Sequence, residues 1–136
     1  MQTHTTDRAP AAVGPYAQAV EIDGWIYTSG QIGLDPTSGR LVEGGFEAQA
    51  RQVLANLAAV LEAAGSGFDR VVKATIYVTD LADFAALNAL YGEALGSHRP
   101  ARSTVQVAAL PLGAAVEIDL VARRRDYRTR PRRPVG

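Results

Sequence analysis

The stretch FEAQARQVLANLAAVLEAAGSGFDRVVKATIYV, residues 46–78, predicts a long helix followed by a strand. Apolar residues between 46 and 64 recur at steps of three and four, which is the period of one helix face. Gly65 then stands where a residue without Cβ commonly ends a helix. Residues 71–78 alternate as a strand with one buried face. On that buried face we expect Val72, Ala74, Ile76 and Val78.

A β-hairpin is predicted on the N-terminal side of this stretch. Residues 19–22 and 25–29 are rich in β-branched and aromatic residues, as strands are. They flank Asp23-Gly24, a dipeptide typical of the two-residue type I′ turn. Two antiparallel strands therefore precede the long helix.

The C-terminal side adds a second helix and two strands. An apolar stripe runs through residues 84–95 and stops at Gly96, which predicts another amphipathic helix. Alternating residues predict strands over 103–109 and 116–121. The expected order of elements is therefore ββαβαββ.

This order favours an α+β, two-layer domain in which both helices pack on one face of a mixed sheet. The second face of the sheet also offers apolar side chains, among them Trp25, Tyr27 and Val121. Because symmetric self-association is the common way to cover such a face, we expect an oligomer. A pocket at the seam between subunits is then a reasonable expectation.

Length and charge divide the chain into three parts. The 136 residues are enough for one domain, which we place at 14–122, after a flexible lead-in at 1–13. Residues 123–136 hold seven arginines and one aspartate, a net charge of +6. Since the whole chain has a net charge of zero, residues 1–122 carry −6. Any contact with nucleic acid is therefore expected in this basic, Arg-rich tail.

Composition excludes several kinds of chemistry. The chain has no cysteine and only two histidines, so we expect no metal site and no thiol chemistry. It has no Gly-rich phosphate-binding motif, and its one lysine, Lys73, is expected to face solvent or an interface rather than form a Schiff base. We also find no secretory signal and no membrane span, and expect a cytoplasmic location.

Arg102 and Glu117 are the strongest candidates for chemistry. If the turn at 111–113 pairs their strands, the guanidinium and the carboxylate share one site. The planar fork of an arginine suits a substrate carboxylate, to which it donates two parallel hydrogen bonds. The alternative is a surface salt bridge that contributes little stability.

Weaker candidates lie in three other places. Tyr16 could line a ligand site or pack over the first strand. Gly30, between Ser29 and Gln31, interrupts a strand and indicates a bulge or a close approach of the backbone, with a ligand as the candidate for the approached group. Asn88 lies at the border of the second helix's apolar stripe, where a solvated amide is the alternative.

Taken in order, these segments resemble the RidA family, also called YjgF. The resemblance covers residues 14–122 and rests on a set of motifs rather than on any one of them. The motifs are GPYAQAV at 14–20, TSGQIG at 28–33, QARQVLANLAAVLEAAG at 49–65, VVKATIYVTDL at 71–81, FAALNALYG at 84–92 and RPARSTVQVAALPLGAAVEIDLVA at 99–122.

The resemblance implies a chorismate-mutase-like fold and a homotrimer with pockets at the subunit interfaces. It implies cofactor-independent hydrolysis of 2-imino acids, the tautomers of enamine acids, to 2-oxo acids and ammonia. Arg102 is similar to the arginine that binds the substrate carboxylate, Glu117 to the acid that activates water, and Tyr16 to a tyrosine of the pocket. The residues that correspond to other pocket positions are Ser29, Gly30, Asn88 and Thr104.

The chain also departs from the family. Many relatives have serine where this chain has Ala17, cysteine where it has Thr104, and an aromatic residue before Pro100. These differences leave the preferred imino acid open. Two alternative functions remain: a deaminase of another catabolic enamine, and an RNA-binding or endoribonuclease-type translation inhibitor that uses the 123–136 tail.

Overall fold

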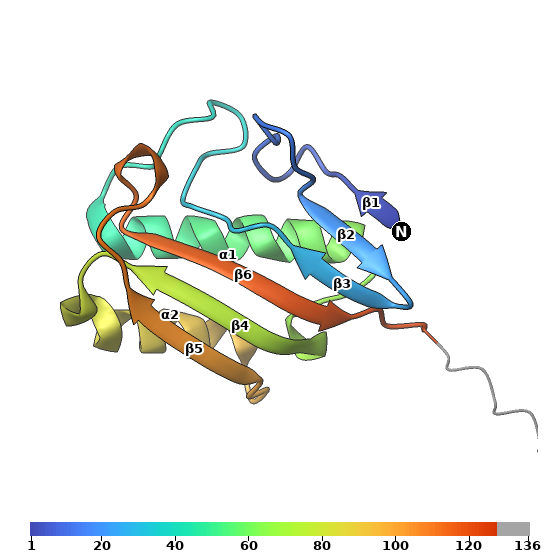
Figure 1. The fold of residues 1–136 in the computed structure, drawn as a ribbon. Helices are drawn as coiled ribbons and strands as arrows, with labels where there is room; N and C mark the ends of the chain where they lie inside the picture. Colours follow the sequence, from blue (N-terminus) through green and yellow to red (C-terminus); the bar gives the residue numbers. More distant parts are fainter. Residues whose placement is uncertain (128–136) are drawn as a thin grey trace, which may run out of the picture.

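The computed structural model describes residues 1–127. In this part of the chain two α-helices, three short 3-10 turns and six strands alternate (Figure 1). The helices are α1 (Gly45–Ala63) and α2 (Phe84–Leu95), and the 3-10 turns are η1 (Phe68–Arg70), η2 (Leu81–Asp83) and η3 (Pro111–Gly113). The strands are β1 (Gln2–His4), β2 (Ala19–Ile22), β3 (Trp25–Thr28), β4 (Val71–Val78), β5 (Ala101–Gln106) and β6 (Val116–Arg123).

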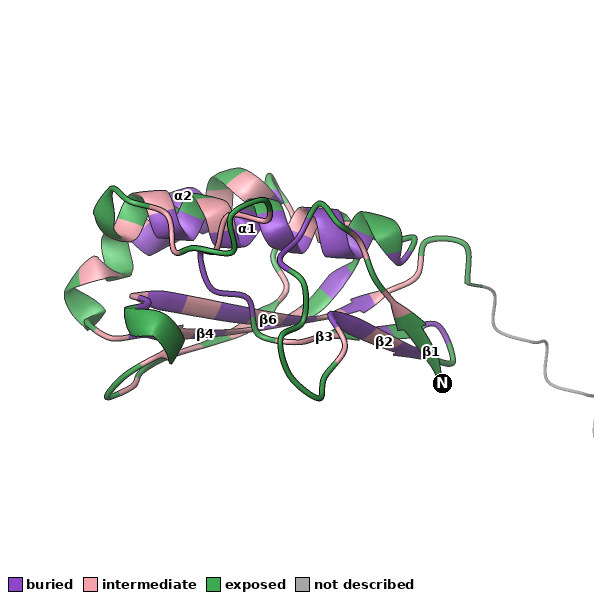
Figure 2. Cartoon of the chain, turned by 90° about the horizontal axis from the view of Figure 1, so that it is seen from above, coloured by how far each residue is buried: buried purple, intermediate pink, exposed green. Residues whose placement is uncertain are grey.

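The strands form one mixed sheet in the order β1-β2-β3-β6-β4-β5. Only β4 and β5 run parallel, joined by α2, and the other neighbours are antiparallel. Figure 2 shows two layers, with α1 and α2 together on one face of the sheet. This arrangement confirms the predicted α+β class and the predicted placement of both helices.

Two local predictions are confirmed by backbone geometry. Asp23 and Gly24 have φ values of 51° and 77°, the left-handed pair that a type I′ turn requires. At the end of α1, Gly65 has a φ of 78°, and the N–H groups of Gly65 and Ser66 donate to the carbonyls of Glu62 and Leu61. That pair of bonds is the Schellman motif, so a glycine is needed there.

The buried face of β4 differs from the expected one at the first two residues of the strand, Val71 and Val72. Val71 is buried, whereas Val72 is 41% exposed. The pairing of β4 with β6 shifts register between Val71 and Lys73, which marks a β-bulge. The prediction for Val72 is therefore wrong, because the bulge turns that side chain to the other face, while Ala74, Ile76 and Val78 are buried as expected.

The chain also begins with a strand that the sequence did not predict. Residues 1–13 were expected to be a lead-in, but β1 pairs with β2 along the edge of the sheet. A strand of three residues has no visible alternation, so only its partner identifies it. Nε2 of His4 lies 2.8 Å from a carboxylate oxygen of the buried Glu21, and this contact holds β1 against β2.

The face of the sheet that the helices leave open carries large apolar side chains. The alternation along the strands places five exposed side chains on this face: Ile22, Trp25, Tyr27, Val72 and Val105. Figure 1 looks onto this open face, and within residues 1–127 no segment covers its centre. The predicted second apolar face is thus present in the described part of the chain.

The first residues of the basic tail are held by the domain. The guanidinium of Arg123 lies between the rings of Trp25 and Tyr127, 4.5 and 3.9 Å from their centroids. Arg125 forms two hydrogen bonds of 2.6 Å with Asp69, and Arg124 donates to Asp126. The four other tail arginines, Arg128, Arg130, Arg132 and Arg133, lie outside the described residues.

Candidate active site

A hollow of about 490 Å³ lies where β3 and β6 begin to separate. Its lining includes Pro10, Ala11, Val13 and Tyr16 from the N-terminal segment, and Pro111 and Leu112 from η3. Ser29, Gly30 and Glu117 line it as well, so four of the predicted site residues meet in this one place. The residues are far apart in the sequence, and the sheet brings them together.

A β-bulge shapes the wall of this hollow. Tyr27 pairs with Val121 and Gln31 bridges Ile118, so three residues of the β3 side stand opposite two of β6. The extra residue brings the backbone of Gly30 against Glu117. A Cβ at position 30 would lie 2.7 Å from Oε2 of Glu117, closer than atoms of this kind approach. The predicted bulge and close approach are both confirmed, and the approaching group is the Glu117 side chain.

We expect Gly30→Ala to lower catalytic efficiency without unfolding the protein. The new methyl group must displace the Glu117 carboxylate, which is the flexible end of a side chain, so the fold can accommodate it. A misplacement of about 1 Å in a catalytic group can cost on the order of 100-fold in rate. Steady-state kinetics and thermal melting of the variant measure the two effects separately.

Gly92→Ala is the matched control for this substitution. Gly92 lies within α2, and a Cβ there would meet no atom within 4 Å. This variant should keep full activity and gain up to about 1 kcal/mol, because alanine favours a helix over glycine. Equal activity in the Gly30 and Gly92 variants would contradict a role for the Gly30–Glu117 contact.

The environment of Glu117 favours a proton on its carboxyl group. Burial raises the pKa of Glu117 above its usual value, and the negative charge of Asp119 raises it further. Burial likewise raises the pKa of Asp119, which lies next to the Tyr77 hydroxyl. A carboxylate with a raised pKa is a better proton acceptor than an ordinary one, which suits a general base.

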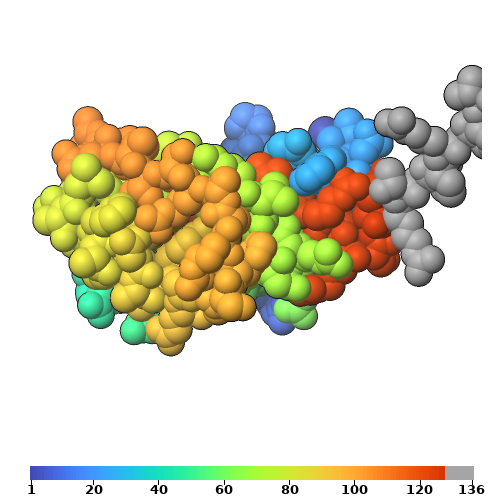
Figure 3. All heavy atoms as spheres, turned by 90° about the horizontal axis from the view of Figure 1, so that it is seen from below, coloured from blue at the N-terminus to red at the C-terminus, as the bar shows by residue number. Residues whose placement is uncertain are grey.

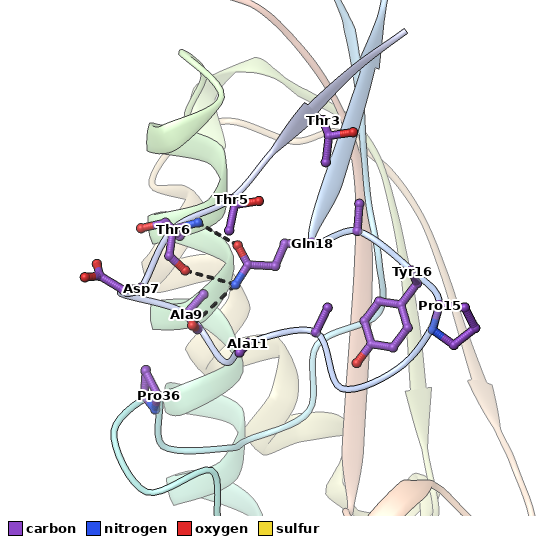
Figure 4. Close-up of a pocket in the computed structure, with 12 residues that line it drawn as sticks. Thr3, Thr5, Thr6, Asp7, Ala9, Ala11, Pro15, Tyr16, Gln18 and Pro36 are labelled. Atoms are coloured by element: carbon purple, nitrogen blue, oxygen red, sulfur yellow. Dashed lines mark hydrogen bonds between the residues drawn. The ribbon is translucent and has the colours of Figure 1, made fainter.

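The loop that carries Tyr16 is held in place by Gln18. The Gln18 side chain is 97% buried, and it accepts from the N–H of Thr6 and donates to the carbonyls of Thr6 and Pro10. Figure 4 shows this side chain pointing toward Thr6 and Ala9, and all three residues line a second hollow of about 700 Å³. Gln18 was not predicted as a site residue, and its role is to hold the segment that lines the hollow beside Glu117.

Ser29 and Tyr16 have different roles in the structure. The Ser29 hydroxyl donates to the carbonyl of Ala17 at 2.5 Å, so it ties the bulge to the Tyr16 loop. Tyr16 itself is 53% exposed and lines both hollows. Its ring therefore faces open space rather than packing over the first strand.

Arg102 lies elsewhere, on the edge strand β5. Its Nη2 donates to Oδ1 of Asn88 on α2 at 2.8 Å. Its guanidinium also lies 5.4 and 5.1 Å from the ring centroids of Phe84 and Tyr91. Figure 3 shows α2 (yellow) and the segment of β5 (orange) together at the surface. The amide and the two rings hold the guanidinium in one orientation while leaving donors free for a ligand.

Phe84 and Tyr91 were not predicted as site residues. In the sequence they belong to the apolar stripe of the second helix, and nothing distinguishes them from core residues. With Asn88 they stand at positions i, i+4 and i+7, so they follow one helix face under Arg102. The Tyr91 hydroxyl and the Thr104 hydroxyl are both buried without a hydrogen-bond partner among the described residues.

Arg102 and Glu117 do not share a site within one chain. The expectation that β5 and β6 are neighbours is wrong, because β4 lies between them. Arg102 pairs with the buried Ala74 and faces the helices, whereas Glu117 pairs with Tyr77 and faces the open side. The predicted residues therefore form two groups, one of Tyr16, Ser29, Gly30 and Glu117, and one of Asn88, Arg102 and Thr104.

The fold and these two groups define a class of protein: a small α+β domain whose sheet has one face covered by helices and one open face. Such a domain has a hollow lined by Glu117 and, apart from it, an arginine cradle, which is Arg102 held by Asn88, Phe84 and Tyr91. Comparison with known proteins makes the family specific. The family described as "Endoribonuclease L-PSP" matches residues 6–124. The chain is also 51% identical over 118 residues to the 2-iminobutanoate/2-iminopropanoate deaminase of Mus musculus, covering 87% of each chain.

Solved structures agree with this match. RidA from the Antarctic bacterium Psychrobacter is 50% identical with a TM-score of 0.87, covering 90% of this chain and 99% of that one. TdcF of E. coli with bound serine is 39% identical with a TM-score of 0.86, covering 91% and 99%. The chain therefore belongs to the RidA (YjgF) family, as its motifs predict.

Proposed function

We propose that this protein is a cofactor-independent deaminase that hydrolyses 2-imino acids, such as 2-iminobutanoate and 2-iminopropanoate, to 2-oxo acids and ammonia. The observation that carries the proposal is Glu117 at the open hollow, with a raised pKa and its carboxylate against Gly30. Relatives about 50% identical over most of the chain bear the name of this activity.

The proposed reaction needs a cationic group that binds the substrate carboxylate, a general base and a water molecule. Arg102 binds the substrate carboxylate through its guanidinium, already oriented by Asn88. Glu117 takes a proton from a water molecule as the water oxygen attacks the carbon of the protonated imine. The nitrogen of the resulting carbinolamine then receives that proton from Glu117 and leaves as ammonia, while the carbinolamine hydroxyl gives its own proton to the Glu117 carboxylate. This leaves the 2-oxo acid, and the proton on Glu117 passes to the released ammonia. Within residues 1–127 no helix could span a membrane, and the cytoplasmic location stays a prediction.

We further propose that the complete site forms between two subunits of a homotrimer. The arginine cradle lies on the edge strand β5, and the hollow with Glu117 lies on the other side of the sheet. One chain cannot bring them together, whereas a second copy can present its β5 edge to the hollow. The exposed apolar side chains of the open face support such an assembly.

A coupled assay tests the activity. Threonine dehydratase generates 2-iminobutanoate, and the appearance of 2-oxobutanoate is followed with and without the protein. We expect the protein to accelerate this appearance over buffer and over a heat-inactivated sample. If it does not, and the same preparation cleaves RNA, the deaminase proposal fails and the endoribonuclease alternative takes its place. The described tail arginines do not favour that alternative, since Arg124 and Arg125 are paired with carboxylates.

A further inference from the structure

Leu112 has a backbone conformation that its side chain does not favour. Its φ is 58° and its ψ is 21°, in the left-handed region that glycine and asparagine adopt more readily than leucine. Positive φ values are observed at only one other residue besides the glycines, Asp23, in the described part of the chain. Such strain is often found at functional sites, where another interaction compensates it.

Folding of the chain does not explain the leucine. The Leu112 side chain is 70% exposed and lies outside the hydrophobic core. The turn around it is closed by backbone hydrogen bonds, from Gly113 to Leu110 and from Ala114 to Pro111, which need no particular side chain at position 112. A glycine or an asparagine would form the same turn with less strain.

The position of Leu112 suggests what its side chain does. It lines the same hollow as Glu117, together with Pro10, Ala11 and the 90% exposed Val13. These four side chains give the hollow an aliphatic part, here called the aliphatic rim, and the Glu117 carboxylate lines the same hollow. That combination suits a ligand with one polar end and one apolar end.

We propose that Leu112 is a specificity-determining residue that binds the aliphatic side chain of the substrate. This inference rests on the proposed deaminase function. The imine carbon has three substituents: the nitrogen, the carboxylate and the side chain. With the carboxylate on Arg102 and water delivered by Glu117, the side chain is the part left to contact the aliphatic rim. Imines with longer aliphatic side chains are therefore better substrates than those with a methyl group.

The test compares the wild-type protein with Leu112→Gly and Leu112→Asn. An L-amino-acid oxidase with catalase generates the imines of alanine and of leucine, and semicarbazide traps whatever imine is not hydrolysed. We expect both variants to lose about 10-fold in kcat/KM on the leucine imine and less than about twofold on the alanine imine. Because either residue relieves the strain at position 112, the melting temperature should stay equal or rise.

Leu81→Asn is the control, because Leu81 is also an exposed leucine but lies in η2, outside the hollow. It should leave the ratio of the two rates unchanged. Equal losses on both imines, no loss on either, or dissociation of the assembly in the Leu112 variants would each overturn the inference while leaving the deaminase function standing. A wild-type protein that hydrolyses neither imine would instead remove the proposed function and the inference together.

Discussion

Arg102→Ala is expected to lower kcat/KM for 2-iminobutanoate by about 100- to 1000-fold, within the loss measured when one partner of a hydrogen-bonded charge pair is removed. Within residues 1–127 the Arg102 guanidinium is the only one that contacts both a side-chain amide, that of Asn88, and two aromatic rings. Without it the substrate carboxylate has no fixed partner. The loss should fall mainly on KM if the arginine only binds the substrate, and on kcat as well if it also orients the imine.

Two further variants separate charge from geometry. Arg102→Lys keeps the charge but not the planar fork, so it should recover only part of the activity. Arg99→Ala is the matched control: Arg99 is a nearby exposed arginine whose side chain donates only to the carbonyls of Gly96 and His98. If the Arg99 and Arg102 variants lost activity equally, the effect would be one of surface charge, and the proposed role of Arg102 in binding the substrate carboxylate would be contradicted.

The features that were predictable from the sequence have local causes. The turn at Asp23-Gly24 and the end of α1 at Gly65 depend on backbone conformations that few residues adopt, so the residue types mark the places. The close approach at Gly30 was predictable because a glycine inside a strand often marks a place where a Cβ would not fit. The stripe of α1 was predictable because a helix that packs on a sheet must have one apolar face.

The features that were not predictable depend on contacts between distant residues. The three-residue turn at 111–113 suggests a hairpin in which β5 and β6 are neighbours. In the structure this connection passes β4, so β6 pairs with the far side of β4 and the two strands are separated. The bulge that exposes Val72 leaves no mark in an alternating run of residues. Gln18 looks like any strand-flanking glutamine until residues 6–10 fold over it.

The family motifs and the spacing along the chain predict different things about Arg102 and Glu117. Spacing alone placed Arg102 and Glu117 side by side in one chain, and the fold places them on opposite faces of the sheet. A resemblance preserves which residues matter, because it compares residue types at matched positions. It contains no information on which copy of the chain supplies each residue, since one sequence describes every subunit.

Glu117→Gln is expected to lower kcat by about 100-fold or more, the usual contribution of a general base. The amide is the same size as the carboxyl group, so the contact with Gly30 is kept and only the ability to accept a proton is lost. Thermal melting should show that the fold is intact. A variant with full activity would contradict the role of Glu117 as the base.

The pH dependence tests the same residue. Glu117 must be ionised to accept a proton, so activity should fall as the pH drops through its pKa, which burial and the charge of Asp119 raise above the usual value of a glutamate. Asp119→Asn removes a negative charge that raises this pKa, so it should shift the acidic limb to lower pH. Glu43→Gln removes an exposed charge elsewhere and should leave the limb in place. If the acidic limb of the pH–activity profile moved equally in both variants, the shift would come from the net charge of the protein and not from the pKa of Glu117.

Mixing subunits decides whether Glu117 acts with the Arg102 of another chain. Each of the two inactive variants, Arg102→Ala and Glu117→Gln, retains the residue that the other lacks. If every site takes its arginine from one subunit and its glutamate from the next, random assembly of equal amounts leaves about a quarter of the sites intact, and about a quarter of the activity returns. If both residues had to come from one chain, each site would carry a substitution and the mixture would stay as inactive as its parts. The opposite faces on which the fold places the two side chains lead us to expect recovery.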